Sequence, residues 1–134
     1  MKAVICFALL LAVCSAAFNP QWKTVNSYSN TWKAAGVYAQ SNARVGQNNV
    51  VTVCGNANYD TTVSAYTYQI GRAGQIWYQG VVGVPPQNLF QGSGYCYYFN
   101  YQVPNVAYPN YSLNLTLQNP STALNTVQVD FYIS

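Results

Sequence analysis

The sequence predicts an all-β chain folded as a two-sheet β-sandwich. Three observations support this prediction: apolar and polar residues alternate over short segments, turn-forming residues separate those segments, and no segment has the longer period of an amphipathic helix. The clearest segment runs from Tyr108 to Ser121, where a tyrosine and three leucines alternate with Asn, Ser, Thr and Gln. A period of two places one side of such a strand in an apolar layer and the other side in water.

The first element of the chain is a predicted signal peptide, residues 1–17. Lys2 supplies a positive charge, residues 3–13 are apolar but too few to cross a bilayer, and small residues follow at 15–17. We expect cleavage after Ala17, which leaves residues 18–134 as a single β-sandwich domain in the secreted or endolysosomal lumen. No later segment is long and apolar enough to be predicted as a membrane span.

About seven or eight strands are predicted after the signal peptide, at spacings that fit a two-sheet sandwich. Those that the pattern marks most clearly are a segment around Val37 and residues 48–56, 61–71, 74–82, 95–103, 108–121 and 125–134. Residues 83–94 are rich in Gly and Pro and are predicted to connect two strands. No repeat, charge run or linker divides the chain, so we expect one domain.

Two cysteines, Cys54 and Cys96, remain once the signal peptide is removed. In an oxidising compartment they predict one disulfide, which closes a loop of roughly 40 residues and contributes about 4 kcal/mol in the loop-entropy estimate. Both cysteines have the opposite parity to the apolar residues of their segments, so both sulfurs are predicted to lie off the apolar face. Two separate buried thiols are the alternative.

Charge and catalytic residue types are scarce. The chain beyond residue 17 carries four basic residues and two carboxylates, Asp60 and Asp130, and the protein has no histidine. Four scattered cations do not form the basic patch that nucleic acid requires. Without histidine there is no Ser-His-Asp or Cys-His arrangement, and the two carboxylates have no visible partner for glycoside hydrolysis or for metal binding. We therefore expect a protein that is not an enzyme and that has no cofactor or metal.

The order of motifs resembles the MD-2-related lipid-recognition (ML) family. The matching elements are Gly46 followed by Val51-x-Val53-x-Gly55, then Cys96 at the start of a strand, Val103-Pro104, and Pro109-x-Tyr111-x-Leu113-x-Leu115. The resemblance covers nearly all of residues 18–134 as a gapped pattern. It departs from the family in the cysteines, because ML domains usually carry three disulfides and Cys54 has no counterpart in the family pattern.

This resemblance implies an immunoglobulin-like, antiparallel two-sheet β-sandwich whose sheets leave a cavity between them. It further implies a monomeric lipid-binding or lipid-transfer protein with transient membrane contact, whose partner is a sterol, a fatty acid, a phospholipid or a glycolipid. Together with the apolar faces of the predicted strands, it points to these lining residues: Tyr66, Tyr68, Trp77, Phe90, Phe99, Tyr101, Leu113 and Leu115. A sandwich core filled with side chains is the alternative.

Surface features leave two other functions open. Asn110 and Asn114 begin N-x-S/T sequons and are predicted N-glycosylation sites. A secreted carbohydrate-binding module is one alternative function, in which exposed rings such as Trp22, Trp32 or Tyr132 stack on sugars. A structural coat or adhesion protein without a small ligand is the other. The direction of the aromatic side chains discriminates between the lipid-binding and the carbohydrate-binding functions, since inward rings favour lipid and a row of outward rings favours glycan.

Overall fold

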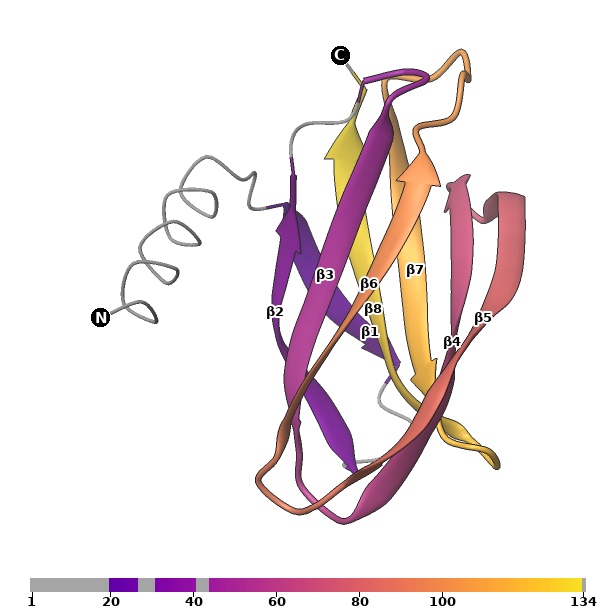
Figure 1. The fold of residues 1–134 in the computed structure, drawn as a ribbon. Coiled ribbons are helices and arrows are strands. Elements are labelled where there is room, and N and C mark those ends of the chain that lie inside the picture. Colours follow the sequence, from indigo (N-terminus) through magenta and orange to yellow (C-terminus); the bar gives the residue numbers. More distant parts are fainter. Residues whose placement is uncertain (1–19, 27–30, 41–43, 134) are drawn as a thin grey trace, which may run out of the picture.

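The computed structural model describes residues 20–26, 31–40 and 44–133, so the predicted signal peptide and its cleavage site lie outside the described residues. The described residues form eight strands in two antiparallel sheets, which confirms the predicted β-sandwich (Figure 1). The strands are β1 (Gln21–Asn26), β2 (Trp32–Ala39), β3 (Asn48–Ala57), β4 (Thr61–Arg72), β5 (Gln75–Leu89), β6 (Gly94–Gln102), β7 (Asn110–Gln118) and β8 (Ala123–Tyr132). Within the described residues, no helix is long and apolar enough to span a membrane.

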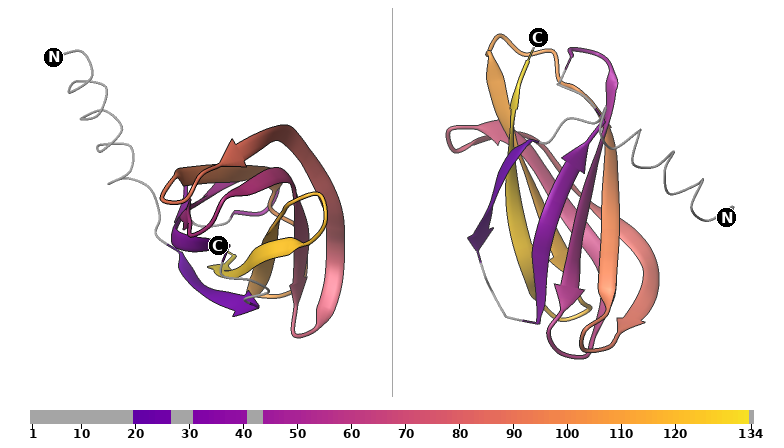
Figure 2. Two further views of the ribbon diagram at one scale, coloured as in Figure 1. Left: turned by 90° about the horizontal axis from the view of Figure 1, so that it is seen from below. Right: turned by 90° about the vertical axis from the view of Figure 1, so that its left-hand side faces the viewer.

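The two sheets differ in width. The larger has the order β1-β8-β7-β4-β5 and the smaller the order β2-β3-β6. Seen along the strands, the sheets face each other as two curved layers (Figure 2). Strands β5 and β6 follow one another in the chain but belong to different sheets, and each is an edge strand. The sandwich therefore has unpaired strand edges where β5 and β6 lie.

Two parts of the larger sheet differ from the sequence expectation. Strand β1, which the alternation did not identify, pairs with β8 at the edge of the sheet. The stretch predicted as a connection, residues 83–94, instead continues β5 as far as Leu89. Gly83 pairs with Ala65 and Gln87 with Val63, so Pro85 and Pro86 lie in a bulge of an edge strand. Proline is tolerated there because it removes no hydrogen bond from a regular ladder.

The apolar side of β7 faces a filled core. Leu113, Leu115 and Leu117 are each 0% exposed, and so are Val51 and Val53 on the opposite sheet. The aromatic side chains of Tyr97 and Phe131 are also buried in this core. Interiors packed in this way have few voids larger than a water molecule. The strand that alternates most clearly in the sequence therefore lies over packed side chains.

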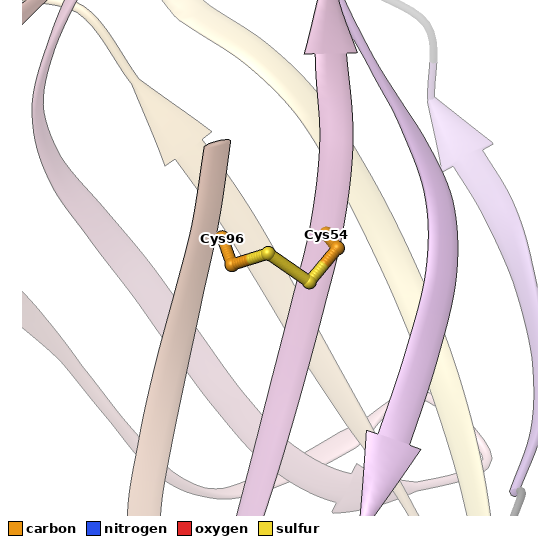
Figure 3. Close-up of a disulfide and its surroundings, with 2 residues drawn as sticks. All are labelled: Cys54 and Cys96. Carbon is orange, nitrogen blue, oxygen red and sulfur yellow. A yellow bond between two sulfur atoms is a disulfide. The ribbon is translucent and has the colours of Figure 1, made fainter. Parts of the chain in front are cut away.

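The predicted disulfide is confirmed. Cys54 of β3 and Cys96 of β6 are directly opposite in the strand register, with their Cα atoms 4.1 Å apart (Figure 3). Cys54 is half-buried and Cys96 exposed, whereas the flanking Val53 and Tyr97 are buried. Both sulfurs therefore lie on the outer face of the smaller sheet, as their parity predicted, and the disulfide ties an edge strand to its neighbour.

Candidate functional site

A cleft of about 500 Å³ lies between the two sheets on the side of the edge strands β5 and β6. Its lining comes from β4 and β5 in the larger sheet, from the end of β6, from the loop that follows it, and from the turn before β3. The lining residues are Gly46, Tyr68, Ile70, Tyr78, Phe99, Asn100, Tyr101, Gln102, Val103, Pro104 and Asn105. Neither carboxylate of the described chain is among them, and the lining contains no charged side chain.

One wall of the cleft is a stack of aromatic rings. The alternation of β6 places Phe99 and Tyr101 on its inward face, and their rings stack with centroids 5.2 Å apart. Tyr68, on the opposite sheet, stacks on Phe99 at 4.5 Å. The stack therefore bridges the two sheets and offers a continuous apolar surface to the cleft.

A glycine makes room for the ring of Tyr68. Gly80 of β5 is directly opposite Tyr68 in the register, and a Cβ atom on Gly80 would lie 2.7 Å from the Tyr68 hydroxyl oxygen. Real Cβ atoms do not approach other atoms so closely. The absence of a side chain at this position lets the Tyr68 ring lie across the neighbouring strand, where it forms part of the cleft wall.

Behind Tyr101 lies a small buried polar cluster. The Nδ2 atom of Asn49 donates a hydrogen bond to the Tyr101 hydroxyl at 3.1 Å, and that hydroxyl shares a hydrogen bond with the Tyr111 hydroxyl. Burial raises the pKa of Tyr101 to about 12, even though its two hydrogen bonds act in the opposite direction. Burial and the neighbouring Tyr101 raise the pKa of Tyr111 as well. Both phenols are therefore neutral at physiological pH, and this end of the cleft carries no charge.

Backbone hydrogen bonds hold the loop at the mouth of the cleft. The N–H of Gly46 donates to the carbonyl of Val103 at 3.1 Å, and the N–H of Val103 donates to the carbonyl of Gln47 at 2.9 Å. Gly46 has a φ of 78°, in the left-handed region that favours glycine. These contacts tie the turn before β3 to the loop after β6, so the mouth has a defined backbone.

The structure brings only part of the predicted lining set together. Tyr68, Phe99 and Tyr101 line the cleft. Tyr66 is buried behind this wall, where its hydroxyl donates to the carbonyl of Tyr98 at 2.8 Å. Leu113 and Leu115 are fully buried in the core and do not line the cleft.

The other two predicted residues lie away from the cleft. Trp77 is half-buried, and its ring stacks on the ring of Tyr108 with the centroids 5.7 Å apart. The guanidinium of Arg72 also lies over the ring of Tyr108. Phe90 is 66% exposed in the turn before β6, at the opposite end of that strand from the cleft.

Several lining residues were not in the predicted set. Ile70 shares the apolar face of its strand with Tyr66 and Tyr68, and Val103-Pro104 is one of the family-like motifs, so both had a sequence signal. For Tyr78, no feature of the sequence indicated that it, and not its neighbour Trp77, would line the cleft. Its position on the cleft side follows from its pairing with Ile70, which depends on a bulge between β4 and β5.

The tryptophans are directed inward. Trp32 is 0% exposed, and Trp22 is half-buried and packs against the core, opposite Val129 in the register. Trp32 therefore cannot stack on a sugar at the surface, whereas Trp22, on the edge strand β1, is only partly covered. Tyr132 is 69% exposed on the outer face of the larger sheet.

Comparisons with known proteins show the fold. No protein-family model matches the sequence, and no curated protein sequence matches it significantly. Among solved structures, the C-terminal domain of Wzt superimposes with a TM-score of 0.62 at 12% identity, covering 86% of this chain and 78% of that one. A Niemann-Pick type C2 protein from the Japanese carpenter ant superimposes with a TM-score of 0.58 at 12% identity, covering 85% of this chain and 99% of that one. Spo0M from Bacillus subtilis gives 0.54 at 8% identity, covering 78% and 49%. The chain thus shares a two-sheet β-sandwich fold with these proteins.

Proposed function

We propose that the protein is a non-catalytic lipid-binding or lipid-transfer protein that holds a fatty acyl chain, a sterol or a glycolipid tail in the cleft between β4, β5 and β6. The observation that carries this proposal is an uncharged, aromatic-walled cleft of about 500 Å³. Small-molecule sites usually have this form, a largely apolar concavity with a few polar groups at its edge. The ML-like motifs and the fold shared with a Niemann-Pick type C2 protein support the same function.

In this proposal the lipid lies at the open side of the sandwich and does not separate the two sheets along their length. The rings of Tyr68, Phe99 and Tyr101 contact its apolar part. Each 100 Å² of apolar surface that leaves water contributes about 2.5 kcal/mol before the cost of ordering the ligand. Asn100, Gln102 and Asn105 provide neutral hydrogen-bonding groups for the head of the lipid.

The cellular setting follows from the same proposal. A disulfide on the surface of a small domain is stable in an oxidising compartment, which supports a secreted or endolysosomal protein. The exposed ring of Tyr78 beside the cleft offers a contact with a membrane while a lipid enters. We propose that the protein acts as a monomer in which catalysis plays no part.

The test is lipid uptake by the folded, oxidised protein, measured by native mass spectrometry with oleic acid, cholesterol and a phosphatidylcholine. A Tyr78→Asp variant places a carboxylate at the apolar mouth and is expected to weaken uptake tenfold or more, which corresponds to about 1.4 kcal/mol. Tyr59→Asp is the matched control, because Tyr59 is 61% exposed and Tyr78 56%, and Tyr59 lies in the turn after β3, outside the cleft. If the protein takes up none of the three lipids, or if both variants bind equally well, the proposal is wrong.

A further inference from the structure

The outer face of the larger sheet carries a regular row of amide side chains. Gln79, Gln69, Asn114 and Gln128 are directly opposite one another on β5, β4, β7 and β8, and Lys23 of β1 continues the row. We call these four amides the amide row. Neighbouring strands lie about 4.8 Å apart, so the row offers one amide at each such step across the sheet.

A row of hydroxyl groups flanks the amide row on one side and a single serine flanks it on the other, each at about 7 Å, the distance of two residues along a strand. On one side, Thr67, Thr116 and Thr126 are opposite one another, and the last two share a hydrogen bond of 2.7 Å. On the other side, Ser112 donates to the Asp130 carboxylate at 2.6 Å. The face is therefore a grid of amides and hydroxyls with very little charge.

The grid is hollowed. A depression of about 340 Å³ is lined by Gln69, Ser112, Asn114 and Gln128, together with the turn between β4 and β5. A second, of about 270 Å³, shares Ser112 with the first and continues to the exposed ring of Tyr132. A third, of about 210 Å³, shares Gln69 and continues toward β5. Because adjoining depressions share side chains, they form one shallow groove across the strands, which we call the outer groove.

The outer groove is polar, and two amide oxygens of its lining residues are buried. The Oδ1 atoms of Asn110 and Asn114 are buried, and within the described part of the chain neither has a hydrogen-bond partner. A buried acceptor without a partner costs about 1–3 kcal/mol. Amides and hydroxyls also both donate and accept, as sugar hydroxyls do.

We propose that the outer groove is a second binding site, and that it takes a neutral oligosaccharide lying across the strands. The repeat of the amide row is close to the length of one hexose unit in an extended chain. Two charged side chains line the depressions, and both have partners within the protein. Asp130 accepts hydrogen bonds from Ser112 and Gln128, and the guanidinium of Arg72 lies over the ring of Tyr108. Tyr132 provides an exposed ring at one end, against which the apolar face of a sugar packs.

The amide row and the lipid cleft lie on opposite faces of β4. The side chains of β4 alternate, so Gln69 lines the outer groove and Ile70 lines the cleft, whereas the ring of Tyr68 lines the cleft and also borders the depression beside β5. Asn110 and Asn114 are both sequon residues that line the outer groove, and a glycan attached to either would occupy it. Binding therefore requires a protein in which neither asparagine carries a glycan.

The experiment uses the oxidised protein produced without N-glycans and titrates it with cellohexaose, chitohexaose and maltohexaose by isothermal calorimetry. The Gln69→Ala/Gln128→Ala variant removes two amides of the row. Gln40→Ala/Gln91→Ala is the matched control, since it removes two exposed glutamine side chains elsewhere. We expect at least one hexasaccharide to bind with a Kd of about 1 mM or tighter, with at least a tenfold loss in the first variant and none in the control.

Lipid uptake, measured on the same samples, is expected to be unchanged in both variants and shows that they are folded. If none of the three hexasaccharides binds, or if the first variant binds as well as the control, the outer groove is not an oligosaccharide site. Either result leaves the proposal for the cleft intact, because that proposal stands or falls with lipid uptake.

Discussion

The substitution Leu115→Ala tests whether the sandwich is filled beneath β7. Leu115 is 0% exposed and lies between Tyr68 of β4 and Val127 of β8 in the strand register. The three carbon atoms removed account for about 2.4 kcal/mol of transfer free energy. A residual cavity of about 60 Å³ adds about 1.5 kcal/mol. The expected loss in the free energy of unfolding is therefore about 4 kcal/mol.

Urea unfolding of the oxidised protein, followed by circular dichroism, measures this loss. Val81→Ala is the control, because Val81 is 68% exposed and its truncation is expected to change the free energy of unfolding by about 0.5 kcal/mol or less. The slope of the transition must be the same for all variants if the comparison is to report on the native state. A loss below about 1.5 kcal/mol for Leu115→Ala would refute the filled core and would place a hollow beneath β7.

Two further predictions concern the smaller sheet and the buried phenols. Gly55→Ala is expected to lower the melting temperature markedly, since a Cβ there would lie 2.2 Å from the carbonyl oxygen of Lys33; Gly94→Ala, with its nearest atom at 3.7 Å, is the calorimetric control and should have a much smaller effect. The Tyr101 phenol holds its proton more tightly in the folded state, where its pKa is about 12, than in the unfolded state, where the pKa is about 10. The resulting stabilisation is complete below pH 10 and is lost as the pH rises from about 10 to about 12. Burial raises the pKa of Tyr97 as well, so alkaline titration followed by tyrosinate absorbance should show these phenols ionising together with unfolding.

The alternation of β6 and β7 was sufficient to predict which of their side chains face the core. Tyr97 and Phe99 on one strand, and Leu113 and Leu115 on the other, all lie inward as their parity indicates. The same parity placed Cys96 on the outer face. These predictions succeed because the period of two is a local property of the extended backbone.

The strands that the sequence did not reveal depend on partners for their conformation. The residues of β1 show no clear alternation, and this strand forms because β8 offers an edge for pairing. The prolines of β5 argue against a strand unless it is known to be an edge strand with a bulge, and sheet order is not visible in a local pattern.

By itself, the sequence determined that the chain forms a β-sandwich, which side chains lie inward on its clearest strands, and where the disulfide would lie. Only the tertiary structure decided that Phe99 lines a cleft whereas Leu115, with the same local pattern, is sealed in the core. It also decided that Gln69 and Gln128 belong to one row. The physical reason is the same in both cases. Side-chain direction is set within a few residues of one strand, but strand order, register and the separation of two sheet edges are set by contacts between residues far apart in the chain.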